Sequence, residues 1–154
     1  MRRLIFRLVL PLTIISFLIF TKWWYAVVVD GTDEILYGFP LVYTCRGFHT
    51  SLSMQFFLLE LCIDVLTYFL ICFLLVFLIN RYVKKIYISK ILSVVLLVIS
   101  GLMLSFSIFI MSLPENIFHT KRPFEIETMT TGYKFIWTKQ VRPDYYQYHP
   151  PKNK

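Results

Sequence analysis

The stretch from Leu52 to Ile79 reads LSMQFFLLELCIDVLTYFLICFLLVFLI, and it sets the class of the whole chain. A helix needs about 20 mainly apolar residues to cross a bilayer. This stretch is longer than that and carries only two charged residues, Glu60 and Asp64. Similar apolar stretches run from Leu4 to Phe20 and from Ile88 to Leu113. The sequence therefore predicts three membrane-spanning helices.

The composition excludes an ordinary soluble domain. Of the 154 residues, 57% are hydrophobic, and the mean hydropathy is +0.64, whereas soluble domains hold about 45–50% apolar residues. A chain of this length encloses one modest core, so the remaining apolar side chains need the bilayer as their surroundings. The net charge of +7 does not indicate nucleic acid as a partner, because the cations gather at the ends of the apolar stretches, where they orient membrane helices.

The positions of the charges predict how the chain crosses the membrane. The connector from Asn80 to Lys90 holds four cations and no acid, and Arg2 and Arg3 precede the first apolar stretch. Because cytoplasmic segments are enriched in Lys and Arg, we expect a multi-pass protein of the cell (inner) membrane, with its N-terminus in the cytoplasm and its C-terminus outside. The chain then divides into a first membrane helix with a basic cytoplasmic N-terminus (1–21), an external loop (22–51), a second membrane helix (52–79), a basic cytoplasmic loop (80–87), a third membrane helix (88–113) and an external tail (114–154).

Both external segments carry strand patterns. In the first loop, the β-branched run up to Val29 is followed by Asp30-Gly31 and a second apolar run, which is a hairpin signal. The tail alternates apolar and charged residues on both sides of Thr131-Gly132, which predicts a second hairpin. The predicted fold class is thus an all-α transmembrane protein of three helices with a small extracytoplasmic β-hairpin cap from the first loop and the tail. Two loose loops are the alternative.

The acid pair of the second helix is the candidate functional site. The spacing of Glu60 and Asp64 puts both on one helical face, which Thr67 continues. Because a charge in lipid is costly, an acid there is a functional candidate by default. Three interpretations stay open: the acids fix helix packing through hydrogen bonds to serines of the third helix, they pair with a basic residue of another subunit, or they form a proton or cation site in an oligomer.

The third helix carries a candidate packing face of small residues. Such residues let helix backbones approach closely in lipid. One line is expected to meet the second helix and the other a neighbouring subunit. The candidate residues are Ser93, Ser100, Gly101, Ser105 and Ser107.

Cysteine usage indicates no internal disulfide framework. Cys62 and Cys72 lie in one helix, about 15 Å apart along its axis and beyond disulfide reach. Cys45 in the external loop is a candidate for an intermolecular disulfide, with an unpaired buried thiol as the alternative.

The sequence carries no catalytic signature. Nucleotide-binding, zinc and serine-hydrolase motifs are all absent, and the three histidines, His49, His119 and His149, are scattered. We therefore expect no enzyme activity, no catalytic residue, no metal, no cofactor and no identifiable small-molecule substrate.

One segment resembles a known group of proteins. The sequence YGFPL at residues 37–41, followed by a helix with Asp64 and Tyr68-Phe69, is similar to a pattern of small bacterial multi-span membrane proteins. The resemblance covers residues 37–79 and implies a bacterial inner-membrane location without an activity. From the residues we expect a non-enzymatic accessory subunit or an immunity-type binding protein, with the lipid bilayer and a membrane-protein partner or a second copy as its partners. An oligomeric proton or cation conductor that uses Asp64 and Glu60 is the alternative.

Overall fold

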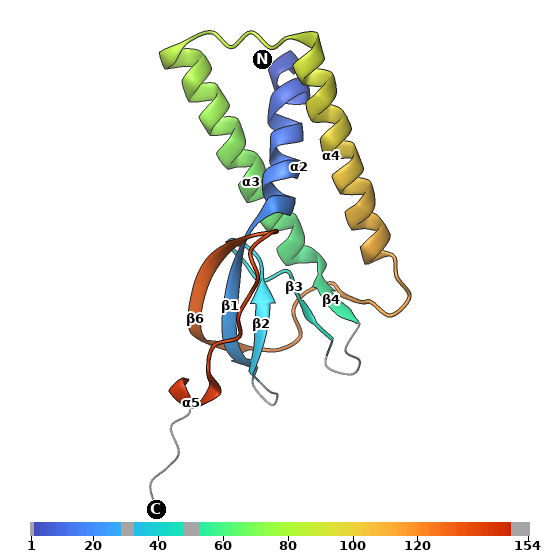
Figure 1. Ribbon diagram of the computed structural model, residues 1–154, viewed down its shortest axis with the longest axis vertical. Coiled ribbons are helices and arrows are strands. Elements are labelled where there is room, and N and C mark those ends of the chain that lie inside the picture. Colours follow the sequence, from blue (N-terminus) through green and yellow to red (C-terminus); the bar gives the residue numbers. More distant parts are fainter. Residues whose placement is uncertain (1, 29–32, 48–52, 149–154) are drawn as a thin grey trace, which may run out of the picture.

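The structure, a computed structural model, describes residues 2–28, 33–47 and 53–148 (Figure 1). The helical segments are α1 (Arg2–Leu4), η1 (Ile5–Val9), α2 (Leu10–Ile19), α3 (Leu58–Leu78), η2 (Ile79–Val83), α4 (Lys90–Met111) and α5 (Tyr145–Tyr148), where η marks a π-helical turn. The strands are β1 (Phe20–Val28), β2 (Asp33–Tyr37), β3 (Thr44–Arg46), β4 (Met54–Phe57), β5 (Ile117–His119) and β6 (Ile126–Phe135).

All six strands form one mixed sheet with the order β5-β4-β3-β2-β1-β6. The pairs are antiparallel except β4 and β5, which run parallel. β6 comes from the end of the chain and pairs with β1 from Phe20↔Phe135 to Val28↔Ile126. The buried hydrophobic core beside the sheet consists of Ala26, Leu36, Val42, Cys45 and Phe57.

The sheet makes the predicted all-α class wrong, because the protein has an α/β fold. The physical reason lies at the helix ends. Phe20 and Thr21 were expected in the first helix but begin β1, and Met54–Phe57 was expected in the second helix but forms β4. Both stretches run directly into the apolar helices that they adjoin and are largely apolar themselves, so periodicity over so few residues does not separate strand from helix there.

The two hairpin predictions had different outcomes. The first loop does form an antiparallel pair, with Val27 opposite Asp33, while its expected turn at Asp30-Gly31 lies outside the described residues. The tail hairpin was wrong, because β6 is a single strand through Gly132. A Cβ at Gly132 would lie 2.7 Å from the indole of Trp23, so this glycine serves a close approach between strands rather than a turn.

Helices α2, α3 and α4 stand together at one end of the molecule, with α2 between α3 and α4 (Figure 1). Two helices, Leu58–Val83 and Lys90–Met111, are long and apolar enough to span a membrane. The apolar helix nearest the N-terminus, Ile5–Ile19, is shorter. Only 17% and 6% of the apolar windows of the two long helices are buried. Because the core helix of a soluble protein hides its apolar side chains, this exposure suggests association with a membrane.

Candidate functional site: the polar seam of helix α3

Asp64 joins α3 to the loop between β2 and β3. Its side chain is fully buried, and each of its oxygens accepts a backbone hydrogen bond. The N–H of Phe39 donates to Oδ2 over 2.5 Å, and the N–H of Leu41 donates to Oδ1 over 2.9 Å. Pro40 between them has no N–H, so the carboxylate takes both backbone donors of this part of the loop.

The loop reaches Asp64 because Gly38 turns the chain toward α3. Gly38 has a φ of +148°, which side chains rarely adopt. A Cβ there would lie 1.9 Å from the Leu41 carbonyl oxygen and 2.9 Å from Asp64 Oδ2. The loop is also tied to β1, since Gly38 N–H donates to the carbonyl of Lys22 and the indole N–H of Trp24 donates to the carbonyl of Gly38, both over 2.9 Å.

Glu60 and Tyr68 continue the same face, one turn on either side of Asp64. Oε1 of Glu60 accepts a hydrogen bond from the backbone N–H of Arg122 over 3.2 Å. The Tyr68 hydroxyl donates to the carbonyl of Phe20 over 2.8 Å, at the start of β1. All three side chains are buried. We call Glu60, Asp64 and Tyr68 the polar seam, because together they bind α3 to three separate segments at the sheet end of the molecule.

The seam differs from the predicted site in its members and its partners. Thr67 does not join it, because its hydroxyl donates to the carbonyl of Ile63 in its own helix. The hydrogen bonds that Asp64 accepts come from the loop backbone, whereas one interpretation expected the α4 serines as partners. Tyr68 was missed as a site residue, although its i+4 spacing from Asp64 was a usable signal.

The candidate packing residues of α4 lie on different sides of the helix. Ser93 and Ser100 are buried on α4, which packs mainly against α2 and η1. Ser105 is exposed, and a Cβ at Gly101 would meet no atom within 4 Å. Ser107 is half-buried and lines a cavity. Among the described residues, nothing covers the side of α4 that carries Gly101 and Ser105.

Cys45 lies in the core of the sheet and is fully buried. Burial, with a smaller contribution from the Glu34 carboxylate, raises the pKa of its thiol to about 12. An intermolecular disulfide at Cys45 would therefore require the sheet to open.

We expect the Cys45 thiol of the folded protein to resist a maleimide at pH 7–8, because the nucleophile that attacks the reagent is an exposed thiolate, whereas this thiol is buried and protonated. Unfolding in denaturant should restore its reactivity. The raised pKa also predicts a pH dependence. The contribution of this thiol to the free energy of unfolding is fully present below pH 9, the ordinary pKa of a thiol, and is lost as the pH rises toward about 12. Mass spectrometry of peptides labelled before and after unfolding measures the protection of Cys45 from the maleimide. Equal labelling of Cys45 in both states would contradict it.

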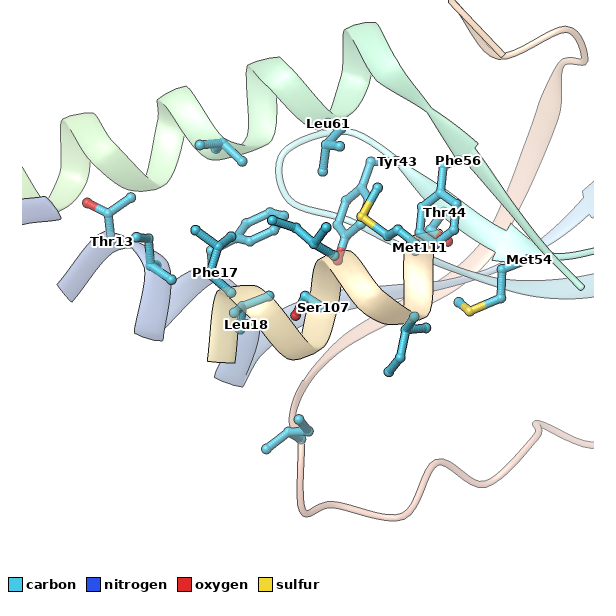
Figure 2. A pocket seen from close by; sticks show the side chains of 16 residues that line it. Thr13, Phe17, Leu18, Tyr43, Thr44, Met54, Phe56, Leu61, Ser107 and Met111 are labelled. Carbon is cyan, nitrogen blue, oxygen red and sulfur yellow. The ribbon is translucent and has the colours of Figure 1, made fainter. Parts of the chain in front are cut away.

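A cavity of about 470 Å³ lies between the three long helical segments and the sheet (Figure 2). Its lining is mostly apolar and includes Phe17 of α2, Leu61 of α3 and Met111 of α4. Tyr43 and Thr44 line it from the sheet side.

In the part of the chain that the structure describes, no group of three or more His, Cys, Asp or Glu side chains is placed to hold a metal ion. Comparison of the chain with protein-family models, curated proteins and solved structures found no match. A carboxylate whose two oxygens accept loop N–H groups is arranged to hold two segments together.

Proposed function

We propose that the chain is a non-enzymatic, multi-pass protein of the inner membrane, and that it presents a small sheet on the extracytoplasmic side as an accessory subunit or an immunity-type binding protein. The exposed apolar surface of α3 and α4 supports the membrane location. The proposal also includes binding of another membrane protein or of a second copy.

The distribution of charge supports the proposed orientation. The basic connector between α3 and α4 lies at the end of the helices remote from the sheet, beside the N-terminal end of the first helix (Figure 1). Since basic segments stay in the cytoplasm, the sheet and the tail would then face the outside. The first helix is short for a full crossing, so in the proposed placement the side chain of Arg7, near its N-terminal end, extends to the headgroups.

The free edge of β6 is the observation that carries the binding function. β6 has ten residues and ends the strand order, so among the described residues no strand pairs with the backbone donors and acceptors of its outer edge. Natural edges are usually guarded by charges or proline. β6 carries Glu127 and Lys134 near its two ends, and the stretch Thr128–Tyr133 between them holds neither a charge nor a proline. A partner strand can add to such an edge through main-chain hydrogen bonds.

The conduction alternative receives less support from the geometry. A carboxylate that carries protons or cations has to exchange them with water or ions, whereas both oxygens of Asp64 are occupied by backbone N–H groups and the side chain is fully buried. We therefore assign the seam a structural role in the proposed function.

Site-specific photo-crosslinking in cells tests the proposed binding edge. A photoreactive amino acid in place of Thr131, on the exposed side of β6, is compared with one in place of Phe118 on β5 at the opposite edge. We expect an adduct of defined mass from position 131 and none of that mass from position 118. An adduct of twice the chain mass would identify a second copy as the partner. The absence of any protein adduct from position 131 would contradict binding at this edge.

A further inference from the structure

We propose that the cavity between α2, α3, α4 and the sheet holds one acyl chain of a membrane phospholipid, with the ester end of the chain near Tyr43 and Thr44. The inference rests on the membrane location proposed above. It adds a lipid-binding site to a protein whose proposed partner binds elsewhere, at β6.

The cavity has the shape and direction that an acyl chain requires. Its lining extends along the helices from Thr13 at one end to Thr44 and Met54 at the sheet end (Figure 2). A lipid chain lies parallel to helices that cross the same bilayer, so the long direction of the cavity matches that of its proposed occupant. The volume of about 470 Å³ falls within the range of about 300–1,000 Å³ of small-molecule sites.

The walls of the cavity match the apolar part of a lipid. Ile14 and Phe17 of α2, Val65 of α3 and Leu104 of α4 contribute hydrocarbon or aromatic surface. α3 and α4 lie on either side of α2 (Figure 1) and expose apolar side chains outward. In a bilayer, the surroundings of this partly open cavity would be lipid chains, so the nearest available occupant is a chain from the same membrane.

The sheet end of the cavity offers hydroxyl groups to a polar ligand atom. Thr44 is 5% exposed, and within the described residues its Oγ1 has no hydrogen-bond partner. A buried hydroxyl without a partner is unfavourable, and such groups in native structures call for a missing partner. Tyr43 lines the cavity beside Thr44, and Ser107 lines it farther along α4 (Figure 2). An ester carbonyl oxygen at this end would accept a hydrogen bond from Thr44.

Photolabelling of the full chain in phosphatidylcholine vesicles tests this site. The probe is phosphatidylcholine with a diazirine in one acyl chain, and labelled residues are located by mass spectrometry. We expect label on Phe17 and Tyr43 inside the cavity and also on Leu102, which is 68% exposed on the outer side of α4. Label on Leu102 without label on Phe17 and Tyr43 would overturn the lipid site. Label on none of the three would contradict the membrane location instead.

Two substitutions on the same helix separate cavity filling from a general effect on α4. Ser107→Phe places a ring in the cavity and should abolish label at Phe17 and Tyr43 while Leu102 keeps its label. Ser105→Phe adds the same ring on the exposed side and should leave all three labels unchanged. Equal loss in both variants would overturn the proposal.

A third variant tests the polar end and remains informative if Ser107→Phe does not fold. Thr44→Val removes the hydroxyl and keeps the shape of the side chain. We expect label at Tyr43 to fall by about fivefold, the factor for loss of one ordinary hydrogen bond, with the elution volume of the protein unchanged. Unchanged label at Tyr43 in this folded variant would overturn the assignment of the ester end.

Discussion

Replacement of Asp64 by alanine is expected to lower the free energy of unfolding by about 2–4 kcal/mol. The change leaves the N–H groups of Phe39 and Leu41 without their acceptor, and an unsatisfied buried donor costs about 1–3 kcal/mol. For a chain of this size, each 1 kcal/mol corresponds to about 2–4 °C in Tm. Thermal unfolding in detergent, followed by circular dichroism, measures the shift.

Two further variants define the cause of that shift. Thr67→Ala removes a hydroxyl that bonds only within α3, and its effect should stay within about 0.5 kcal/mol. Asp64→Asn keeps one acceptor oxygen, so its Tm should lie between those of the wild type and Asp64→Ala. An unchanged Tm in Asp64→Ala would show that the seam does not hold the loop.

Gly38→Ala is expected to prevent recovery of the folded protein. The added Cβ would meet the Leu41 carbonyl oxygen at 1.9 Å, which is backbone and cannot rotate away, and the φ of +148° is unfavourable for alanine. The loop would have to move off Asp64, so the clash and the loss of both hydrogen bonds act together, at a cost of about 4 kcal/mol or more. Size-exclusion chromatography in detergent compares the yield of folded protein.

Gly101→Ala is the matched control for Gly38→Ala. A Cβ at Gly101 meets no atom within 4 Å, and alanine favours a helix interior over glycine by about 1 kcal/mol. This variant should give at least the wild-type yield. If Gly38→Ala gave the same yield as Gly101→Ala, the described loop conformation would be contradicted.

The sequence predicted the parts of the fold that depend on local pattern. The long apolar stretches became α3 and α4, and the β1–β2 pairing followed its hairpin signal. The spacing of Glu60 and Asp64 correctly predicted one helical face, because that periodicity is intrinsic to a helix. The hydrogen-bond donors to Asp64 could not be predicted in this way, since they lie 25 and 23 residues away in the chain.

The errors came from residues whose roles depend on distant partners. Met54–Phe57 forms a strand because β3 and β5 lie on its two sides, and a stretch of four residues that runs directly into α3 is too short for its own pattern to show this. Gly132 was assigned to a turn because glycine is common there, whereas the indole of Trp23 on the neighbouring strand requires it. The strand order of the sheet thus depends on pairings between segments that are distant in the sequence.

Cysteine accessibility in intact spheroplasts tests the central claim most directly, namely that the helices cross the membrane and hold the sheet outside. The test uses two variants with a new cysteine at an exposed position. Lys139→Cys places it after β6, and Lys85→Cys places it in the basic connector between α3 and α4. With a membrane-impermeant maleimide, we expect Lys139→Cys to react in intact spheroplasts and Lys85→Cys to react only after lysis, with the wild type as the background. Reaction of Lys85→Cys before lysis would contradict the claim.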